Sequence, residues 1–324
     1  MGRAPEREIG GAIIGLETRA RRISRWVIER LTGGDARGAT VASVHTRVAN
    51  LRFDSGELVC LGAASVPLAA NGLSIDLPPG ATLGTLGLEA GQVILLSRRS
   101  LVIPAAGLRV DLAGASPWEP RPRPGRTSPR ELARRARRAR ALTVAEGSSP
   151  SLLPLLWVSG STDLPSEPAR SAAPAAAVLR AAAVGADPDG VRRAAASLAG
   201  LGPGLTPSGD DYLAGFAAAW VLAAAALGRR GPERAEVPRA LARGAAPGAS
   251  PLGRAWIAHA ARGEVAEPMA RFLTALLGGA PQALAVSTRG VLGLGASSGT
   301  DWMVGALSGV DALLAAIVPV AAWN

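Results

Sequence analysis

The stretch Gly202-Pro-Gly-Leu-Thr-Pro-Ser-Gly-Asp-Asp211 leads directly into a long apolar run, Tyr212 to Leu227. Glycine tolerates backbone conformations that other residues avoid, and proline interrupts helices, so the stretch predicts a loop. The apolar run is rich in alanine, the best helix former, and predicts a buried helix over 211–226. A loop that feeds a helix start presents free N–H groups at the positive end of the helix dipole. The sequence therefore predicts an anion-binding site here.

A second segment near the C-terminus repeats this pattern. Ser208-Gly-Asp-Asp-Tyr-Leu-Ala-Gly215 and Ser298-Gly-Thr-Asp-Trp-Met-Val-Gly305 share the order Ser-Gly-x-Asp-aromatic-apolar-x-Gly, and a Gly-x-Gly precedes each. A glycine inside a helix costs about 1 kcal/mol relative to alanine, and a close neighbour would explain its presence. We therefore expect the two helix starts to pack against each other, so that both loops line one cleft.

Three carboxylates are the candidate catalytic residues: Asp210, Asp211 and Asp301. Adjacent carboxylates serve as metal ligands, as acceptors for substrate hydrogen bonds or as general bases. The alternative for Asp211 and Asp301 is helix capping, which needs no function. A carboxylate pair repels an anionic substrate, so the site would need a Mg²⁺ bridge or an amide or ammonium group on the substrate. No cofactor is certain from the sequence, and Mg²⁺ is the candidate.

The candidate substrate-binding residues supply backbone N–H groups or hydroxyls to an anion. They are Gly202, Gly204, Thr206, Ser208, Gly209, Ser298, Gly299 and Thr300. The alternative for the hydroxyls of the first loop is a hydrogen-bonded turn stabilised by Pro203 and Pro207. Asn50 joins the candidates, either as a site amide or as a turn residue.

The composition excludes several classes of chemistry. All 35 basic residues are arginine, which excludes a Schiff-base lysine and a standard phosphate-binding P-loop. The single cysteine, Cys60, excludes a disulfide within the chain and a cysteine-based zinc site. With only His45 and His259, a three-histidine zinc site is excluded as well, and we interpret both histidines as structural.

The charge and the chain ends point away from nucleic acid and membrane. The net charge of +10 is spread along the chain without the interleaved aromatic residues of single-strand binders, so we expect no nucleic-acid binding. The first residues are charged with no apolar core after them, and the apolar run 212–227 is short for a membrane span. We expect a cytoplasmic protein without a membrane segment.

The first third of the chain predicts two regions. Residues 1–36 predict a helical lead-in, because apolar residues recur there at helical spacing: Ile23, Trp26, Val27 and Leu31. Residues 37–120 predict a β-rich domain, in which short apolar or alternating runs are separated by turns. Asp54-Ser-Gly56, for example, indicates a hairpin turn between two strands.

The remainder predicts helices. Residues 121–175 read as a linker and a basic helix that starts at Ser128-Pro-Arg-Glu131, and residues 176–324 as a helical domain. The arginines of the basic helix indicate either a solvated face or a docking surface for an acidic subunit or anionic substrate. The candidate helices after it are 175–184, 188–199, 211–226, 252–262, 268–277, 281–289 and 302–317. The expected fold class is α+β: a mostly antiparallel, barrel-like sheet followed by an all-helical part.

The ten-residue loop, with an apolar helix after it, resembles the signature of the AllH-like family, once catalogued as a domain of unknown function. Supporting stretches are Arg47-Val-Ala-Asn-Leu51, Ala115-Ser-Pro-Trp118, Ser250-Pro-Leu-Gly253 and Gly295-x-Ser-Ser-Gly-Thr-Asp301. The family includes a subunit of a bacterial oxamate carbamoyltransferase of allantoin catabolism, and the resemblance covers most of the chain.

The resemblance implies a role in carbamoyl transfer within a multi-subunit complex. The reaction would convert a ureido acid such as oxalurate, with phosphate, into oxamate and carbamoyl phosphate. The implied partners are a subunit like an acyl-CoA synthetase and a second large subunit. The alternative is a non-catalytic structural or ligand-binding subunit, in which the Gly202–Asp211 loop only packs a helix start.

Overall fold

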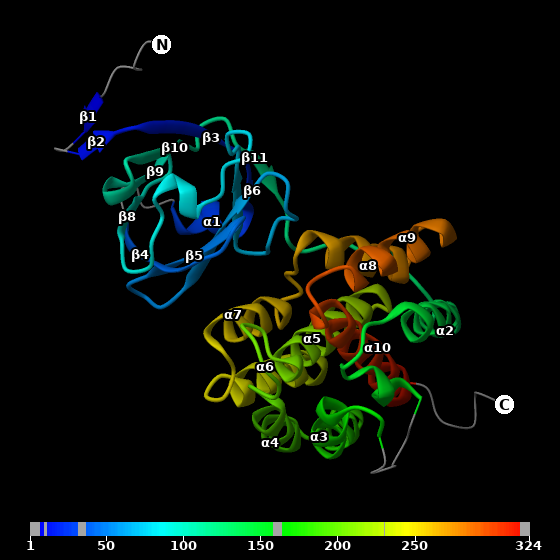
Figure 1. Ribbon diagram of the computed structural model, residues 1–324. Coiled ribbons are helices and arrows are strands. Elements are labelled where there is room, and N and C mark those ends of the chain that lie inside the picture. The colour runs from blue at the N-terminus through cyan, green and yellow to red at the C-terminus, as the bar shows by residue number, and fades with distance from the viewer. Residues whose placement is uncertain (1–6, 10–11, 32–36, 158–163, 230, 318–324) are drawn as a thin grey trace. The chain divides into compact units, whose positions relative to one another are not determined.

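The computed structural model describes residues 7–9, 12–31, 37–157, 164–229 and 231–317. The chain divides into two compact units, 1–120 and 121–324, each with its own hydrophobic core. The first is built from strands and the second from helices (Figure 1). The expected α+β class is confirmed.

The N-terminal unit is a closed, barrel-like sheet (Figure 1). Its strands are β3 (Leu16–Ser24), β4 (Arg37–Val44), β5 (Val48–Phe53), β6 (Leu58–Ala63), β7 (Gly72–Ile75), β8 (Val93–Leu96), β9 (Ser100–Ile103) and β10 (Leu108–Asp111). They run in the order β10-β9-β8-β4-β5-β6-β7-β3, and β3 pairs back to β10 and closes the sheet. Among these strands, neighbours pair antiparallel except β6–β7 and β3–β10.

Three short strands lie outside this ring. β11 (Ser116–Trp118) extends the sheet in parallel with the end of β3, while β1 (Arg7–Ile9) and β2 (Ala12–Ile14) form a separate antiparallel pair. The predicted hairpin between β5 and β6 is confirmed, and Gly56 turns the chain there with a φ of 84°. Such a left-handed conformation favours glycine.

The predicted helical lead-in over 1–36 is wrong. Residues 16–24 form β3, and only α1 (Arg25–Arg30) is helical among the described residues of that range. Exposed Arg19 and Arg21 flank buried Ala20, which is the two-residue period of a strand with one face in the core. Ser24 then starts α1, since its side chain accepts a hydrogen bond from the Trp26 N–H.

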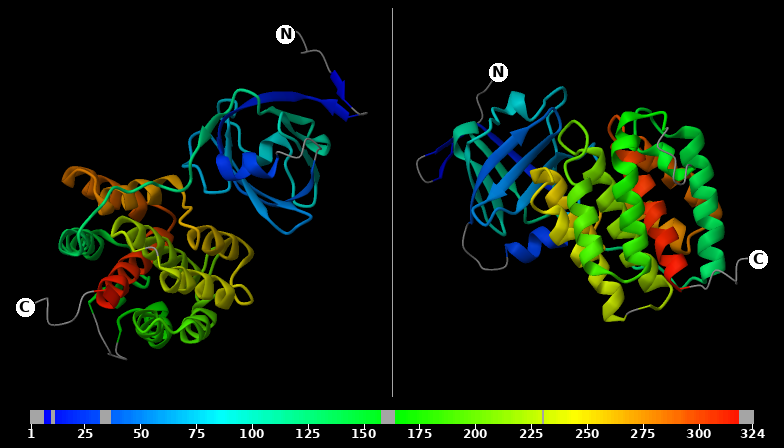
Figure 2. Two further views of the ribbon diagram at one scale, coloured as in Figure 1. Left: turned by 180° about the vertical axis from the view of Figure 1, so that it is seen from behind. Right: turned by 90° about the horizontal axis from the view of Figure 1, so that it is seen from below.

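The C-terminal unit contains helices throughout (Figures 1 and 2). They are α2 (Pro129–Glu146), α3 (Glu167–Val184), α4 (Pro188–Leu198), α5 (Ser208–Ala226), α6 (Pro232–Ala245), α7 (Pro251–Ala260), α8 (Glu267–Leu277), α9 (Pro281–Leu292) and α10 (Ser298–Ile317). α5 and α10 are buried along most of their length and form the centre, with the other helices around them.

Glycines let α5 and α10 approach each other closely. A methyl group on Gly215 would lie 2.1 Å from the carbonyl oxygen of Trp302, and one on Gly305 would lie 2.0 Å from that of Tyr212. Only a hydrogen fits at these two positions, so the backbones are in direct contact. The expectation that the two helix starts pack against each other is confirmed.

Two helix predictions need correction. α3 begins at Glu167 rather than at 175, because Ser166 caps it and Pro174 is tolerated within it. α6 was not expected, although Val237, Leu241 and Ala245 recur at helical spacing and are buried. The segment 158–163 of the predicted linker lies outside the described residues.

The basic helix is α2, and its arginines do not act alike. Arg135 donates to the carbonyl oxygens of Ala275 and Gly279, and Arg140 donates to that of Leu156 and pairs with Asp311. Arg134, Arg137 and Arg138 are exposed. Part of the cluster therefore ties α2 to the rest of the unit.

α10 is the one described helix that is long and apolar enough, by length and composition alone, to cross a membrane. Within the structure, 78% of its apolar window is buried, as expected of a core helix.

Candidate functional site

Two loops meet where α5 and α10 begin. Residues 202–205 of the first loop and Gly293, Gly295 and Ala296 of the second are exposed. Beneath them, the Thr206 and Ser298 hydroxyls lie 3.0 Å apart and hydrogen-bond across the two loops. The structure thus brings together the two segments that share the repeated sequence pattern.

The two helix starts are built alike. A methyl group on Gly209 would lie 1.9 Å from the carbonyl oxygen of Leu198, and one on Gly299 would lie 1.9 Å from that of Val291. Each glycine therefore lets its helix start against the end of the preceding helix, α4 or α9. The repeated sequence corresponds to a repeated helix–loop–helix structure.

The helix-start N–H groups are less free than the sequence analysis expected. The Gly209 N–H donates to the carbonyl oxygen of Leu201 at 2.9 Å, and the Gly299 N–H donates to that of Leu294 at 3.0 Å. The Asp210 N–H donates to Pro207 O at 2.9 Å. The loops themselves satisfy these donors, so an anion has fewer backbone partners here than a bare helix start would offer.

Asp210 has a structural role, because both of its carboxylate oxygens accept backbone hydrogen bonds. Its Oδ1 accepts from the Gly200 N–H at 2.8 Å, and its Oδ2 accepts from the Ser250 N–H at 2.9 Å. A methyl group on Gly253 would lie 2.1 Å from the same Oδ2, so α7 starts directly against this carboxylate. With both oxygens engaged in a buried position, Asp210 joins the segment before the first loop to the start of α7 and is not placed to meet a substrate.

Asp211 and Asp301 are different, because each keeps an unused oxygen. Both side chains are buried, and Oδ2 of each has no hydrogen-bond partner among the described residues. The Asp301 Oδ1 accepts from the Leu152 N–H at 2.7 Å. A buried carboxylate oxygen without a partner costs free energy, so it requires an explanation such as protonation or a role in catalysis.

Hydroxyls from both loops face the two carboxylates. Ser298 of α10 and Thr206 face Asp211, while Ser208 of α5 and Ser297 face Asp301. Each helix thus directs its first serine toward the carboxylate of the other helix. None of these hydroxyls completes a hydrogen bond to the free Oδ2 atoms.

Burial raises the pKa of both carboxyl groups. Burial raises the pKa of Asp211 well above its usual range, the Ser298 and Thr206 hydroxyls lower it, and the charges of Asp301 and Asp210 raise it further. Burial likewise raises the pKa of Asp301, against the Leu152 N–H and the neighbouring serine hydroxyls. Paired carboxyl groups in such surroundings hold a proton at a pH at which exposed ones have lost it.

A family comparison covers both loops. The model described as oxamate carbamoyltransferase subunit AllH matches residues 198–310, which run from α4 into α10. The model described as the AllH family N-terminal domain matches residues 19–117, which contain most of the closed sheet. The chain belongs to the AllH family. No curated protein and no solved structure matches it.

The remaining candidates of this AllH-family chain have structural partners. The Thr300 hydroxyl is buried and accepts from the Ser148 N–H at 2.9 Å, which fixes the end of α2. Gly202 and Gly204 have φ values of 102° and 98°, which explains their glycines through backbone conformation. Asn50 lies within β5 in the other unit and donates to the Ser43 hydroxyl at 2.9 Å, so it is not a turn residue.

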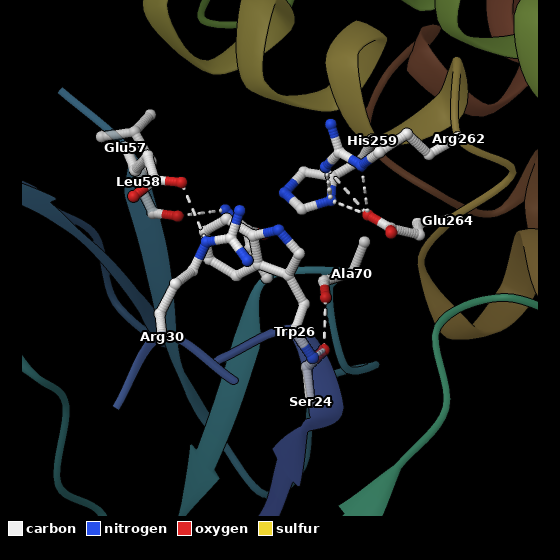
Figure 3. Close-up of polar contacts among 10 residues, drawn as sticks. Ser24, Trp26, Arg30, Glu57, Leu58, Ala70, His259, Arg262 and Glu264 are labelled. Carbon is white, nitrogen blue, oxygen red and sulfur yellow. Dashed lines mark hydrogen bonds and ion pairs between the residues drawn. The ribbon is translucent and has the colours of Figure 1, made fainter. Parts of the chain in front are cut away.

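The histidines and the cysteine lie outside the two loops. His45 follows β4 and is not in a strand. His259 is buried on α7, with its Nδ1 2.7 Å from Oε2 of Glu264, and Arg262 contacts both (Figure 3). Burial raises the pKa of the Cys60 thiol to about 12, which makes it a poor nucleophile.

The carboxylates left for the candidate Mg²⁺ are Asp211 and Asp301, each with one free oxygen. The described residues contain no group of three or more His, Cys, Asp or Glu side chains that could hold an ion. Asp210, the third carboxylate of the motif, has both oxygens occupied by backbone N–H groups. We therefore derive no step through Mg²⁺.

Proposed function

We propose that this chain is a subunit of an oxamate-type carbamoyltransferase complex and that Asp211 and Asp301 act on the carbamoyl group. The family description supports membership of such a complex. The observation that carries the catalytic assignment is the pair of buried carboxyl groups, each with an unpartnered oxygen, at the facing starts of α5 and α10.

The proposed reaction needs one proton to move. Hydrogen phosphate attacks the terminal carbonyl carbon of a ureido acid such as oxalurate, and the bond from that carbon to the inner nitrogen breaks. The products are carbamoyl phosphate and an amide acid such as oxamate. The proton of hydrogen phosphate ends on the nitrogen that leaves, since an unprotonated amide nitrogen is a poor leaving group.

A carboxyl pair with a raised pKa suits this proton transfer. The protonated member, Asp211, donates its proton to the leaving nitrogen and takes up the proton of the hydrogen phosphate in its place, while the ionised member, Asp301, accepts hydrogen bonds from the terminal –NH₂. In the reverse direction Asp211 gives its proton to the phosphate and takes one from the amide nitrogen, and Asp301 keeps its role. A urea-type group offers both the donors and the acceptor that such a pair requires, which answers the objection that two carboxylates repel a purely anionic ligand.

Access to the pair requires the two loops to move. The Thr206–Ser298 hydrogen bond lies between the exposed loop residues and the buried carboxyl groups, so a ligand must replace it. Gly202 and Gly204 give the first loop the backbone freedom to do so. We propose that the displaced hydroxyls then bind the carbonyl or phosphate oxygens of the ligand.

The other features of the complex are also proposals. We propose that the chain acts in the cytoplasm with a subunit like an acyl-CoA synthetase and a second large subunit. The competing role is that of a non-catalytic subunit, and the internally satisfied N–H groups and the structural Asp210 favour it. The free oxygens of Asp211 and Asp301 favour catalysis, because packing alone does not require them.

The test measures carbamoyl phosphate formed from oxalurate and phosphate by the purified complex. Asp211→Asn keeps the shape of the side chain but removes its acid, and we expect turnover to fall at least 100-fold, the scale of a general acid. Asp189→Asn is the matched control, because Asp189 is exposed on α4 and pairs with Arg192 on the same helix. Equal turnover by the Asp211→Asn and wild-type complexes, with equal melting temperatures, would contradict the catalytic assignment and leave the non-catalytic role.

A further inference from the structure

The helical unit contains a cavity away from the two loops. A cavity of about 890 Å³ opens between the C-terminal part of α5, one face of α6 and the end of α7. This volume lies in the range of small-molecule pockets. Val221, which lines it, follows Asp211 by ten residues on the same helix, or about 15 Å at 1.5 Å per residue. The cavity is therefore separate from the carboxylate pair.

The lining combines small apolar side chains with arginines. α5 contributes Val221, Ala224 and Ala225 at helical spacings of three and four, α7 contributes Ala258, and the turn after α7 contributes Ala261 and Arg262. These residues form an apolar wall of the cavity, referred to below as the alanine floor, and their small side chains leave room between the helices. A flat, apolar group can lie against this alanine floor.

α6 presents a mixed face to the same cavity. Ala235, Pro238 and Ala242 alternate there with Arg239 and Arg243, which lie one helical turn apart. The exposed fractions of the two arginine side chains are 65% and 60%. Both pair with a single carboxylate, Glu236, so the pair of guanidinium groups keeps a net positive charge.

The whole lining is strongly positive. Its charged side chains are Arg121, Arg229, Arg239, Arg243, Arg262 and Glu264. Glu264 is engaged by Arg262 and His259, and these contacts lower its pKa to about 2 although burial opposes them. With Glu236 included, two carboxylates therefore face five guanidinium groups, which recognise phosphate through paired N–H donors.

We propose that this cavity binds a nucleoside polyphosphate, with the phosphates on the arginines of α6 and the base on the alanine floor. Arg239 and Arg243, one turn apart, can contact successive phosphates. The planar guanidinium groups at the rim can also stack on the base. Bound there, the nucleotide contacts α5 at the end opposite Asp211. The site does not depend on the carbamoyltransferase assignment.

The experiment is calorimetric titration of the full-length chain with ATP, pyrophosphate, inorganic phosphate and adenosine at 0.15 M NaCl. We expect ATP to bind with a dissociation constant below 1 mM, more weakly as salt rises, and pyrophosphate to compete with it. We expect the Arg239→Ala/Arg243→Ala variant to bind ATP at least tenfold more weakly.

The matched control is Arg134→Ala/Arg138→Ala on α2, which removes the same charge at the same spacing from another exposed face. We expect it to leave ATP binding unchanged. Three results would overturn the proposal: no ATP binding at 5 mM, equal weakening by both double variants, or binding of a poly-glutamate peptide with none of ATP. The last result would identify the cavity as a docking surface for an acidic protein.

Discussion

Replacing Gly305 with alanine tests the direct contact of α5 and α10, on which the carboxylate pair depends. The added methyl group would lie 2.0 Å from the carbonyl oxygen of Tyr212 and 2.8 Å from its Cα, far inside the 3.4 Å at which ordinary contact begins. The obstacle is backbone, so no side-chain rotation relieves it. The two central helices must move apart.

The magnitude follows from two opposing contributions. Overpacking a core costs about 1–3 kcal/mol, and a clash with a backbone carbonyl belongs at or above the upper end. Alanine recovers about 1 kcal/mol of helix propensity relative to glycine. We expect Gly305→Ala to lower the free energy of unfolding by about 2 kcal/mol. The melting temperature of the helical unit should then fall by roughly 4–8 °C.

Gly290→Ala is the matched control. Gly290 is exposed on α9, and a methyl group there would meet nothing within 4 Å, so only the propensity gain of up to about 1 kcal/mol remains. The assay is thermal unfolding followed by circular dichroism at 222 nm, which reports mainly on the helices. If Gly305→Ala melts at or above the wild-type temperature, the central helices are not in backbone contact and the reasoning fails.

Three variants test the different roles of Asp210 and Asp211. Asp210→Ala should lower the free energy of unfolding by about 3 kcal/mol, because two backbone N–H groups lose a charged acceptor. Asp210→Asn keeps one acceptor oxygen, so we expect a smaller loss. If denaturant titrations show equal, negligible losses for both variants, Asp210 has no structural role. Asp211 has a raised pKa in the folded state, so its protonation stabilises the fold fully below the unfolded pKa of about 4, and this stabilisation is lost as pH rises through the folded pKa. Asp211→Asn should therefore gain stability relative to wild type as pH rises from 4 to 8, and a constant difference over that range would show that the pKa is not raised.

The sequence predicted the helical unit well where glycine and alanine marked the boundaries. The repeated Ser-Gly-x-Asp pattern located both central helix starts, and Gly215 and Gly305 predicted that they meet. Fewer helix-start N–H groups are free than the sequence predicted, because the carbonyl oxygens of Leu201 and Leu294 accept from the Gly209 and Gly299 N–H groups. Loop closure of this kind depends on backbone geometry, which residue types do not specify.

Elsewhere the local patterns were ambiguous. The apolar residues Ile23, Trp26, Val27 and Leu31 do lie at helical spacing. However, β3 ends and α1 begins between the first two of them, so the pattern combines residues of a strand and of a short helix. Similarly, Asp210 and Asp211 are neighbours of the same type, and the sequence could not tell the carboxylate that binds the start of α7 from the one that keeps a free oxygen. Their roles differ because Gly253 brings α7 against only one of them.

The most direct test of the account is a carbon-13 NMR pH titration of the aspartate carboxyl groups, with Asp211→Asn to assign the Asp211 signal. We expect one signal that keeps the chemical shift of a protonated carboxyl group well above the usual aspartate pKa and that disappears in the variant. If every aspartate signal titrates near pH 4, Asp211 is an ordinary ionised carboxylate and the proposed acid of the carbamoyl transfer does not exist.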